Sequence, residues 1–344
     1  MSDAKASLPL FMWQREAAAA ALAARDRWPH ALLLEGRRGI GKRALALHYA
    51  QALLCENPRP DGGPCGHCAS CGYVHAGTHP DLRLIEPIER DEEGNETQLD
   101  EIVVDRIREL IDFTQLSTHR QRAKLAIIIP AELMNPAAAN ALLKTLEEPP
   151  PGTHLILVSH QPGRLSPTIV SRCQRLAAPA PDPAIAADWL AQQSVDQPAL
   201  LLAQAGGAPL LALALAAPGV QRERRSLLDQ LAKPEQLSPV ALGARIDAYR
   251  KDERKAMLAD VVYWLSTWVA DLAASASGGA PRFHPDRRAA LAQLASQVAL
   301  LPLFRYYQTL LRQRELLGHP LVPRLVAEAL LFEYRGLFTD AHGR

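Results

Sequence analysis

The sequence predicts an α/β domain with a parallel sheet, followed by an all-α region, and three observations support this prediction. Up to about residue 178, short apolar runs alternate with amphipathic helical patterns, as in successive βαβ units with helices on both faces of a sheet. Prolines then crowd residues 179–183, and no segment beyond them has the character of a strand. The remaining sequence is rich in alanine and leucine, which favour helices.

The strands predicted in the first region are short apolar runs, each followed within one or two residues by a polar residue, a glycine or a proline. The acidic and polar stretch at 91–100 is expected to be a loop. A chain of 344 residues is too long for a single simple core, so two or three domains are expected. The predicted strands are residues 31–34, 82–85, 102–104, 125–129 and 155–158.

Three helices between these strands are predicted from apolar spacing and from their terminal residues. The first, at 42–54, follows a glycine-rich turn. Asp105 is expected to be the N-cap of the second, whose apolar residues share one face. Asn135 caps the third, Pro136 occupies its first position, where proline is favoured, and Pro149 ends it.

The net charge excludes binding that depends on a strong global field. The chain carries 38 Lys and Arg against 37 Asp and Glu, a formal net charge of +1, so contact with nucleic acid has to be local or shared with partners. The N-terminal residues lack the arrangement of a signal peptide, and no apolar run approaches the roughly 20 residues that cross a bilayer. A cytoplasmic protein with no membrane partner is therefore expected, and its cysteines should stay reduced.

A phosphate-binding loop is predicted between the strand at 31–34 and the helix at 42–54. The segment from Gly36 to Lys42, Gly-Arg-Arg-Gly-Ile-Gly-Lys, fits the pattern G-x-x-x-x-G-K in the required strand, loop and helix context. Backbone N–H groups at such glycines surround phosphates, and the lysine reaches the outer ones. The candidate nucleotide-binding residues are Gly36, Gly39, Gly41 and Lys42.

The same loop lacks the side chains that hold Mg²⁺ beside a nucleotide. The residue after the lysine is normally Ser or Thr, whose hydroxyl binds the metal, but here it is Arg43, which has no lone pair to offer. The strand at 125–129 should end in an acidic residue, yet Pro130 and Ala131 follow it, and Glu132 lies past the strand end. Together the two losses predict that Mg²⁺-dependent hydrolysis is absent, while ATP binding itself is left open.

A structural zinc site is predicted from a cluster that contains four of the five cysteines. In a reducing compartment such a cluster indicates a metal rather than disulfides, and four thiolates leave no coordination position open for catalysis. His67 and His75 are alternative ligands. No basic recognition helix follows the cluster, which argues against a DNA-reading zinc finger. The cysteines, spaced C-x₉-C-x₂-C-x₂-C, are Cys55, Cys65, Cys68 and Cys71.

Four segments in this order resemble a known family. The phosphate loop and the cysteine cluster are followed by Asn140-Ala141-Leu142-Leu143-Lys144-Thr145-Leu146-Glu147-Glu148-Pro149-Pro150 and then by Ser171-Arg172-Cys173. The chain thereby resembles the bacterial clamp-loader family, which includes the gamma/tau ATPase subunits and the delta-prime subunits of DNA polymerase III. The specific motifs lie in roughly the first 180 residues, and the helical remainder agrees in size and class.

The resemblance implies an AAA+-type P-loop domain with an inserted zinc module, an all-α lid, and an all-α collar that joins subunits in a ring. The expected boundaries are 1–178 for the P-loop domain, with its zinc module at 55–71, then 179–220 for the lid and 221–344 for the collar. The implied cofactor is a structural Zn²⁺.

The resemblance also implies that ATP sites lie between subunits and that Arg172 reaches into a neighbour's site as an arginine finger. A fixed guanidinium can neutralise charge that develops on the γ-phosphate. Loss of the Mg²⁺-binding side chains, with Arg172 retained and no arginine at 205–209 in the lid, resembles the delta-prime branch. The implied partners are a gamma/tau-like ATPase and a delta-like clamp-opening subunit, with the sliding clamp and primer–template DNA reached through the complex.

Two alternatives predict different behaviour. An active gamma/tau-like ATPase with an unusual Mg²⁺ site would hydrolyse ATP as an isolated chain, and Lys42→Ala would abolish that activity. An independent zinc-dependent nucleic-acid binder would bind DNA in a salt-sensitive way, which the net charge of +1 disfavours.

Overall fold

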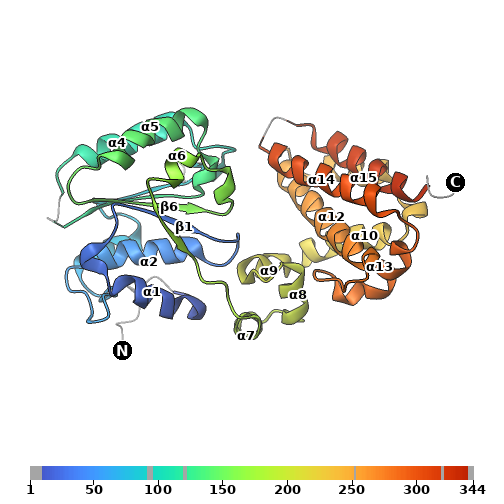
Figure 1. Cartoon of the computed structure of the whole chain (residues 1–344), viewed down its shortest axis with the longest axis horizontal. Helices are drawn as coiled ribbons and strands as arrows, with labels where there is room; N and C mark the ends of the chain where they lie inside the picture. The colour runs from blue at the N-terminus through green and yellow to red at the C-terminus, as the bar shows by residue number, and fades with distance from the viewer. Residues whose placement is uncertain (1–9, 91–95, 119–121, 252, 319–320, 340–344) are drawn as a thin grey trace. The chain divides into compact units, whose positions relative to one another are not determined.

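The chain divides into two compact units, 1–182 and 183–344, which are drawn in Figure 1. The first unit is α/β and the second is helical, so the predicted order of an α/β domain and an all-α region is confirmed. The computed structural model describes residues 10–90, 96–118, 122–251, 253–318 and 321–339.

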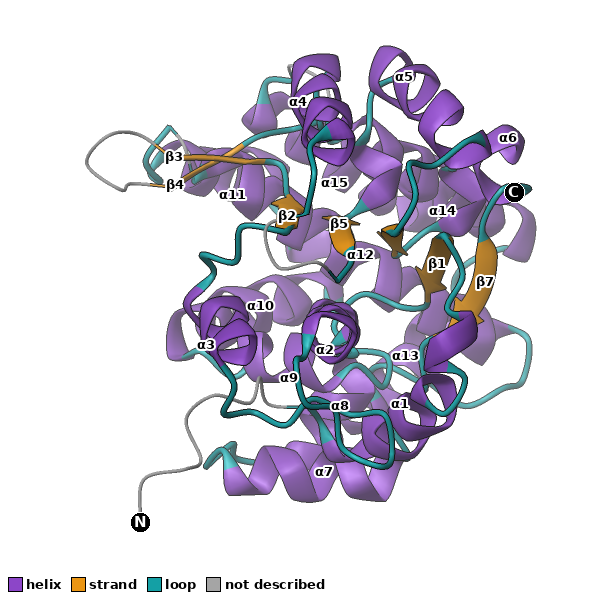
Figure 2. Cartoon of the chain, turned by 90° about the vertical axis from the view of Figure 1, so that its left-hand side faces the viewer, coloured by secondary structure: helices purple, strands orange, loops and turns teal. Residues whose placement is uncertain are grey.

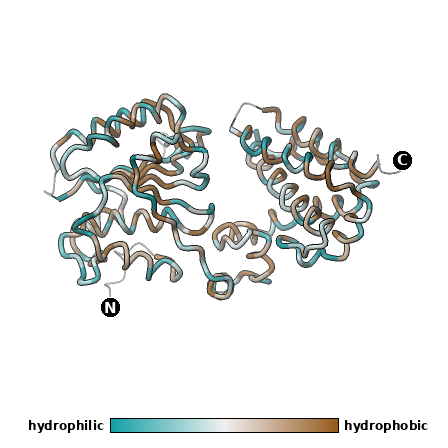
Figure 3. The backbone as a smooth tube through the Cα atoms, viewed as in Figure 1, coloured by the Kyte–Doolittle hydropathy of each residue, from teal (hydrophilic) through white to brown (hydrophobic). Residues whose placement is uncertain are grey.

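A five-stranded sheet in the order β2-β5-β6-β1-β7 forms the centre of the first unit, and every pair of neighbouring strands is parallel. The strands β1, β5 and β6 are almost wholly buried, which explains their continuous apolar sequences. These strands are coloured as hydrophobic in Figure 3. The strands are β1 (Ala31–Glu35), β2 (Leu82–Ile85), β5 (Lys124–Ile128), β6 (Thr153–Ser159) and β7 (Gln174–Ala177).

Helices cover both faces of this sheet. In Figure 1, α1 and α2 lie on one face, and α4 and α5 lie on the other. Asn135 caps α5 as predicted, since its side chain accepts a hydrogen bond from the backbone N–H of Ala138 at 2.9 Å. The helical segments of the first unit are η1 (Met12–Gln14), α1 (Arg15–Leu22), η2 (Arg25–Arg27), α2 (Lys42–Leu54), α3 (Ala69–Ala76), α4 (Val104–Gln115), η3 (Ala131–Leu133), α5 (Pro136–Glu147), η4 (Pro162–Arg164) and α6 (Pro167–Val170).

The strand predicted at 102–104 is wrong, and so is the N-cap predicted after it. Ile102 forms only an isolated bridge with Met134, and Val104 is already the first residue of α4. The N-cap is Val103, whereas Asp105 lies in the first turn and pairs with Arg108 at 2.9 Å. The apolar run at 102–104 thus contains both an isolated β-bridge and the start of a helix. Apolar character alone does not distinguish this arrangement from a strand.

The chain also contains strands that the sequence analysis does not predict. β4 (Glu96–Gln98) pairs antiparallel with β3 (Ile88–Arg90), so the expected loop at 91–100 is partly a strand, while residues 91–95 lie outside the described residues. Figure 2 shows this two-stranded ribbon at the side of the unit. β7 is an edge strand that is largely exposed, and its Gln-Arg-Leu-Ala sequence therefore lacks the apolar run of a buried strand.

In the second unit, prolines mark the starts of most helices, which matches the preference of proline for the first turn. Within the described residues no single helix is both long enough and apolar enough to span a membrane, and α8 and α9 meet those criteria only as a pair bent by 105°. The segments are α7 (Pro183–Gln192), α8 (Pro198–Gln204), α9 (Pro209–Leu215), α10 (Pro218–Leu231), η5 (Pro234–Gln236), α11 (Pro239–Asp247), α12 (Arg254–Ala276), η6 (Pro285–Arg287), α13 (Arg288–Ala295), α14 (Leu300–Leu316) and α15 (Pro323–Thr339).

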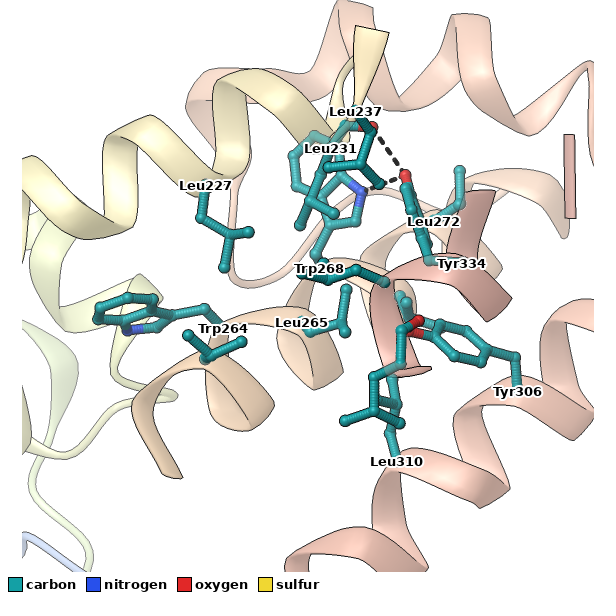
Figure 4. Packing of buried hydrophobic residues seen from close by; sticks show 14 of the residues in the cluster. Leu227, Leu231, Leu237, Trp264, Leu265, Trp268, Leu272, Tyr306, Leu310 and Tyr334 are labelled. Carbon is teal, nitrogen blue, oxygen red and sulfur yellow. Dashed lines mark hydrogen bonds between the residues drawn. The ribbon is translucent and has the colours of Figure 1, made fainter. Parts of the chain in front are cut away.

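Buried apolar residues of the second unit form one cluster within α7–α9 and a larger one within α10–α15. In the larger cluster, Trp268 Nε1 donates to Tyr334 Oη at 2.9 Å, and the Tyr334 hydroxyl donates to Leu231 O at 2.8 Å (Figure 4). These bonds satisfy polar atoms that would otherwise be costly to bury. The two clusters fit a lid at 179–220 and a collar at 221–344, and those boundaries stay predictions.

Candidate functional site

The predicted phosphate loop lies between β1 and α2, at the carboxyl end of a central strand. Gly39 and Gly41 have φ angles of 84° and 92°, in the left-handed region that favours glycine. A Cβ atom on Gly41 would lie 2.5 Å from the ring of Phe11. Both the backbone path and the packing of the loop therefore require glycine at this position.

Lys42 is buried, and its ammonium group bonds to the loop itself. Its Nζ donates to the carbonyl oxygens of Gly36 and Arg37, at 2.6 and 2.5 Å. Burial lowers the Lys42 pKa to about 8, and the negative charge of Glu132 opposes this shift. These two carbonyls occupy two of the three N–H donors of the ammonium, so a phosphate meets a lysine that is already largely bonded to its own loop.

An N-terminal segment packs over the same loop. Trp13 Nε1 and Gln14 Nε2 both donate to the carbonyl oxygen of Ile40, at 3.0 and 3.1 Å. The rings of Phe11 and Trp13 stack at a centroid distance of 4.8 Å, with Phe11 against Gly41. No sequence motif marks these residues, so they were not predicted to belong to the site.

Arg43 occupies the position of the expected Mg²⁺-binding hydroxyl, and its guanidinium is paired with Glu86, which follows β2. Nε and Nη2 of Arg43 donate to the two carboxylate oxygens, at 2.7 and 3.0 Å. Glu86, the first carboxylate after β2, therefore pairs with a guanidinium. Arg43 itself cannot bind a cation.

The end of β5 lacks a carboxylate, as predicted, but Glu132 in η3 is close enough to act on Lys42 electrostatically. One oxygen of Glu132 accepts a hydrogen bond from the backbone N–H of His160 at 2.9 Å. Burial, together with the nearby positive charge of Lys42, lowers the pKa of His160 to about 4. His160 directly follows β6 and is a residue near the loop that the sequence analysis did not identify.

The four cysteines of the predicted zinc site come together. Their Sγ atoms all lie within 4.8 Å of one another. The distances are 3.9 Å from Cys55 to Cys68 and 4.0 Å from Cys65 to Cys71, close to the ~3.8 Å edge of a tetrahedral zinc site with ~2.3 Å bonds. The neighbouring His67 is exposed and hydrogen-bonded to the Cys65 carbonyl, outside this set. The donor set fits a closed tetrahedral metal site.

Local folding explains how the four sulfurs meet. Cys55 follows the last residue of α2, Cys68 is the N-cap of α3, and Cys71 lies in the first turn of α3. Backbone N–H groups of Cys65, Cys68 and Cys71 each donate to the sulfur of another cysteine, at 3.2 to 3.4 Å. Burial raises the pKa of Cys65, but backbone N–H groups of His67 and Cys68 outweigh it and bring the value to about 6. Thiolate, the form that binds metal, is therefore favoured at Cys65.

The segment from Gly77 to Asp81 joins the cysteine module to the rest of the domain. His79 Nδ1 accepts a hydrogen bond from Asp81 N at 3.0 Å, which places the ring proton on Nε2. His79 Nε2 lies 2.8 Å from Ser70 Oγ, and the Ser70 hydroxyl donates to Leu54 O at 2.8 Å. This buried relay links β2, α3 and the end of α2.

Arg172 follows α6 and is placed at the surface, with 32% of its side chain exposed. Its guanidinium donates to the Glu147 carboxylate and to the carbonyl of Thr168. These hydrogen bonds go to α5 and α6 rather than to the phosphate loop, so Arg172 is not bonded to the loop of its own chain.

The phosphate loop and the cysteines lie at opposite ends of α2, about 20 Å apart for a helix of 13 residues.

Comparison with known proteins shows which family the chain belongs to. The family description "DNA polymerase III, delta subunit" matches residues 16–181, and "DNA polymerase III, delta subunit, C terminal" matches residues 219–335. The DNA polymerase III subunit delta' of Escherichia coli K12 is 33% identical over 279 residues, covering 79% of this chain and 78% of that protein. The chain belongs to the delta-prime family of DNA polymerase III. The match accompanies the predicted parallel α/β domain and the helical remainder of the chain.

Two further sequence relatives are subunits of DNA polymerase III. The delta' subunit of Pseudomonas aeruginosa is 43% identical over 228 residues, 65% of this chain and 66% of that protein. The tau/gamma subunit of Haemophilus influenzae is 33% identical over 211 residues, which cover 60% of this chain and 28% of that protein. A gamma-subunit-related protein from Thermotoga maritima has a TM-score of 0.44 and 18% identity, covering 94% of this chain and 99% of that one.

Proposed function

We propose that this delta-prime chain is a non-hydrolysing subunit of the clamp loader that supplies Arg172 in trans to the ATP site of a neighbouring subunit. Its partners are a gamma/tau-like ATPase and a delta-like clamp-opening subunit in the cytoplasm. Through that complex it supports the loading of the sliding clamp onto primer–template DNA. Relatives named tau/gamma support the assignment of these partners.

The observation that carries the proposal is the state of the two cationic residues at the start of α2. Lys42 is bonded to two loop carbonyls and Arg43 is paired with Glu86. An ATPase would use the lysine for the outer phosphates and the next residue for Mg²⁺. With both positions committed inside the protein, the loop has become part of the fold, and ATP hydrolysis is assigned to the neighbouring subunit.

Arg172 suits the role of a finger because it is partly exposed, charged and not bonded to its own loop. A guanidinium is planar and always protonated, so it can bind two oxygens of a phosphate in a fixed orientation. The short helix α6 begins with a capped proline turn, in which Ser166 Oγ accepts from Ile169 N at 3.4 Å. This turn fixes the backbone from which Arg172 projects.

The cysteine module would hold a structural Zn²⁺ through Cys55, Cys65, Cys68 and Cys71. Bound there, the metal would join the end of α2 to the start of α3 and supply folding energy instead of catalysis. The expected stoichiometry is one zinc for each chain, measured by atomic emission on the purified protein. Its loss should destabilise the first unit.

The finger is tested by reconstituting the clamp loader with Arg172→Ala and measuring ATP turnover and clamp loading. An arginine finger is worth about 10³-fold or more in rate at the site it completes, so turnover at that one site should collapse and loading should fail. Arg172→Lys should not rescue it, because a lysine lacks the fork geometry. Normal turnover and loading with Arg172→Ala would contradict the assignment.

The second candidate is an active gamma/tau-like ATPase, and the electrostatic proximity of Glu132 to Lys42 favours it. It requires ATP turnover by the isolated chain with Mg²⁺, abolished by Lys42→Ala. We expect turnover at the background level for both the parent and the variant. The same preparation should show no salt-sensitive binding to DNA, which separates it from an independent zinc-dependent nucleic-acid binder.

A further inference from the structure

The Arg172 side chain is held almost completely by its own subunit. A guanidinium has five N–H donors. Nε donates to Glu147 Oε1 at 2.8 Å, and Nη2 donates to the same oxygen. Nη1 donates to Thr168 O at 2.9 Å and to Ser171 Oγ at 3.4 Å. Only one of the five donors is left for a partner while these bonds persist.

Glu147 is the last residue of α5, 25 positions before Arg172 in the sequence. Two elements therefore hold the guanidinium, since the carboxylate comes from α5 and the carbonyl of Thr168 from α6. The Glu147 side chain is 48% exposed and the Arg172 side chain 32% exposed. The pair is on the surface, where a phosphate from another subunit can reach it, and where solvent screens it.

We propose that Glu147 is a positioning residue that orients Arg172 and holds its charge until the terminal phosphate of a neighbour's ATP takes the place of the carboxylate. This inference rests on the proposed role of Arg172 as a finger in trans. The exchange involves no covalent step: one anionic acceptor replaces another on the same N–H donors. A terminal phosphate offers more charge and more oxygens than a carboxylate, so it can displace Glu147 from the guanidinium.

Two consequences follow for the neighbouring ATP site. While Glu147 neutralises Arg172, the guanidinium adds little attraction to that site, so ATP binding there is weaker than a free finger would allow. The same carboxylate keeps the guanidinium in one orientation, which lowers the entropy lost when the finger engages. Charge and orientation are separable by mutation, because glutamine keeps an oxygen acceptor without the charge and alanine removes both.

The experiment uses the reconstituted clamp loader with parent chain, Glu147→Gln, Glu147→Ala, Arg172→Ala, or the double variant Glu147→Gln/Arg172→Ala. Glu148→Gln is the matched control, because Glu148 is an adjacent exposed glutamate and Arg172 bonds to Glu147 instead. The measured quantities are KM and kcat for ATP without clamp or DNA, at low and high salt. Thermal unfolding of each isolated chain checks that it is folded.

We expect Glu147→Gln to lower the KM for ATP about two- to fivefold at low salt, the range for a partly exposed charge pair, with kcat maintained. High salt should shrink this difference. Glu147→Ala should lower kcat, since the finger is no longer oriented. Glu148→Gln should match the parent chain, and the double variant should match Arg172→Ala.

The possible failures are distinguishable. If Glu147→Gln has the KM and kcat of the parent while Arg172→Ala is defective, the finger stands and the role of Glu147 is overturned. If the effect of Glu147→Gln persists in the Arg172→Ala background, it does not pass through Arg172 and the inference is again overturned. If Arg172→Ala is itself normal, the proposed function fails and this inference fails with it.

Discussion

Replacing Ser70 by alanine tests whether the cysteine module is fastened to the phosphate-loop helix by hydrogen bonds. Ser70 is 1% exposed and His79 is 3% exposed, so neither can turn to solvent. The Ser70 hydroxyl accepts from His79 Nε2 and donates to Leu54 O, each at 2.8 Å. Alanine removes one oxygen atom and fills nothing in its place. It takes this acceptor from the buried N–H of His79 and this donor from a carbonyl at the end of α2.

The expected cost follows from these two broken bonds. A buried polar group left unsatisfied costs about 1–3 kcal/mol, and the N–H of His79 is the more costly of the two because a carbonyl tolerates partial satisfaction better. We expect about 2–3 kcal/mol in total. For a unit of this size each kcal/mol shifts Tm by about 2–4 °C, so the first unit should melt about 4–12 °C lower.

The assay is differential scanning calorimetry of the zinc-loaded chain, following the transition of the first unit. Ser117→Ala is the control, because Ser117 is an exposed serine of the same unit and its loss should leave Tm unchanged within about 1 °C. Zinc content should stay the same in both variants. If Ser70→Ala melts with the parent chain, the relay does not stabilise the junction and the reasoning is refuted.

Three further predictions concern the metal, acid stability and the second unit. Cys65→Ser should lower the zinc content of the purified chain and increase protease cleavage within 55–71, whereas unchanged zinc would remove Cys65 from the ligand set. Burial lowers the His48 pKa from 6.5 to about 4, so His48 alone should take about 3 kcal/mol from the unfolding free energy as the pH drops from about 6.5 to about 4. In urea titrations His48→Gln should remove this part of the pH dependence, whereas the exposed His30→Gln should leave it in place. Asp271 accepts three backbone N–H bonds and one from the His284 ring, so Asp271→Ala should cost the second unit about 3–5 kcal/mol in chemical denaturation, and a loss below about 1 kcal/mol would contradict that view.

Features set by local sequence could be predicted. The phosphate loop needs glycines with positive φ and a lysine at a fixed spacing, and the structure has Gly39, Gly41 and Lys42 in that arrangement. The cysteines were found by their spacing, because two C-x₂-C steps bring sulfurs together around one turn. In both cases the site is built from residues close in sequence, so their spacing predicts how they are arranged in space.

Features set by contacts between distant residues could not be predicted. Arg172 was identified by its motif, but its pairing with Glu147 depends on how α5 and α6 pack. Likewise Phe11 packs on Gly41 although α1 and β1 separate the two residues in the sequence, and no periodicity marks that contact. β7 was not predicted because an exposed edge strand does not need apolar residues on both faces.

The degenerate loop explains why the glycines and the lysine serve the fold even though we assign no hydrolysis to this chain. The Lys42 ammonium holds the carbonyls of Gly36 and Arg37 together, and Phe11 packs on Gly41, so these residues now maintain the local backbone. On this proposal, a loop held in this way would make no γ-phosphate contact during the cycle. Under the proposed function, the availability of Arg172 would then depend on the neighbour's nucleotide alone. A subunit whose own site did not respond to nucleotide would present its finger in one orientation until the neighbour's phosphate engages it, and Glu147 is the group that would set this orientation.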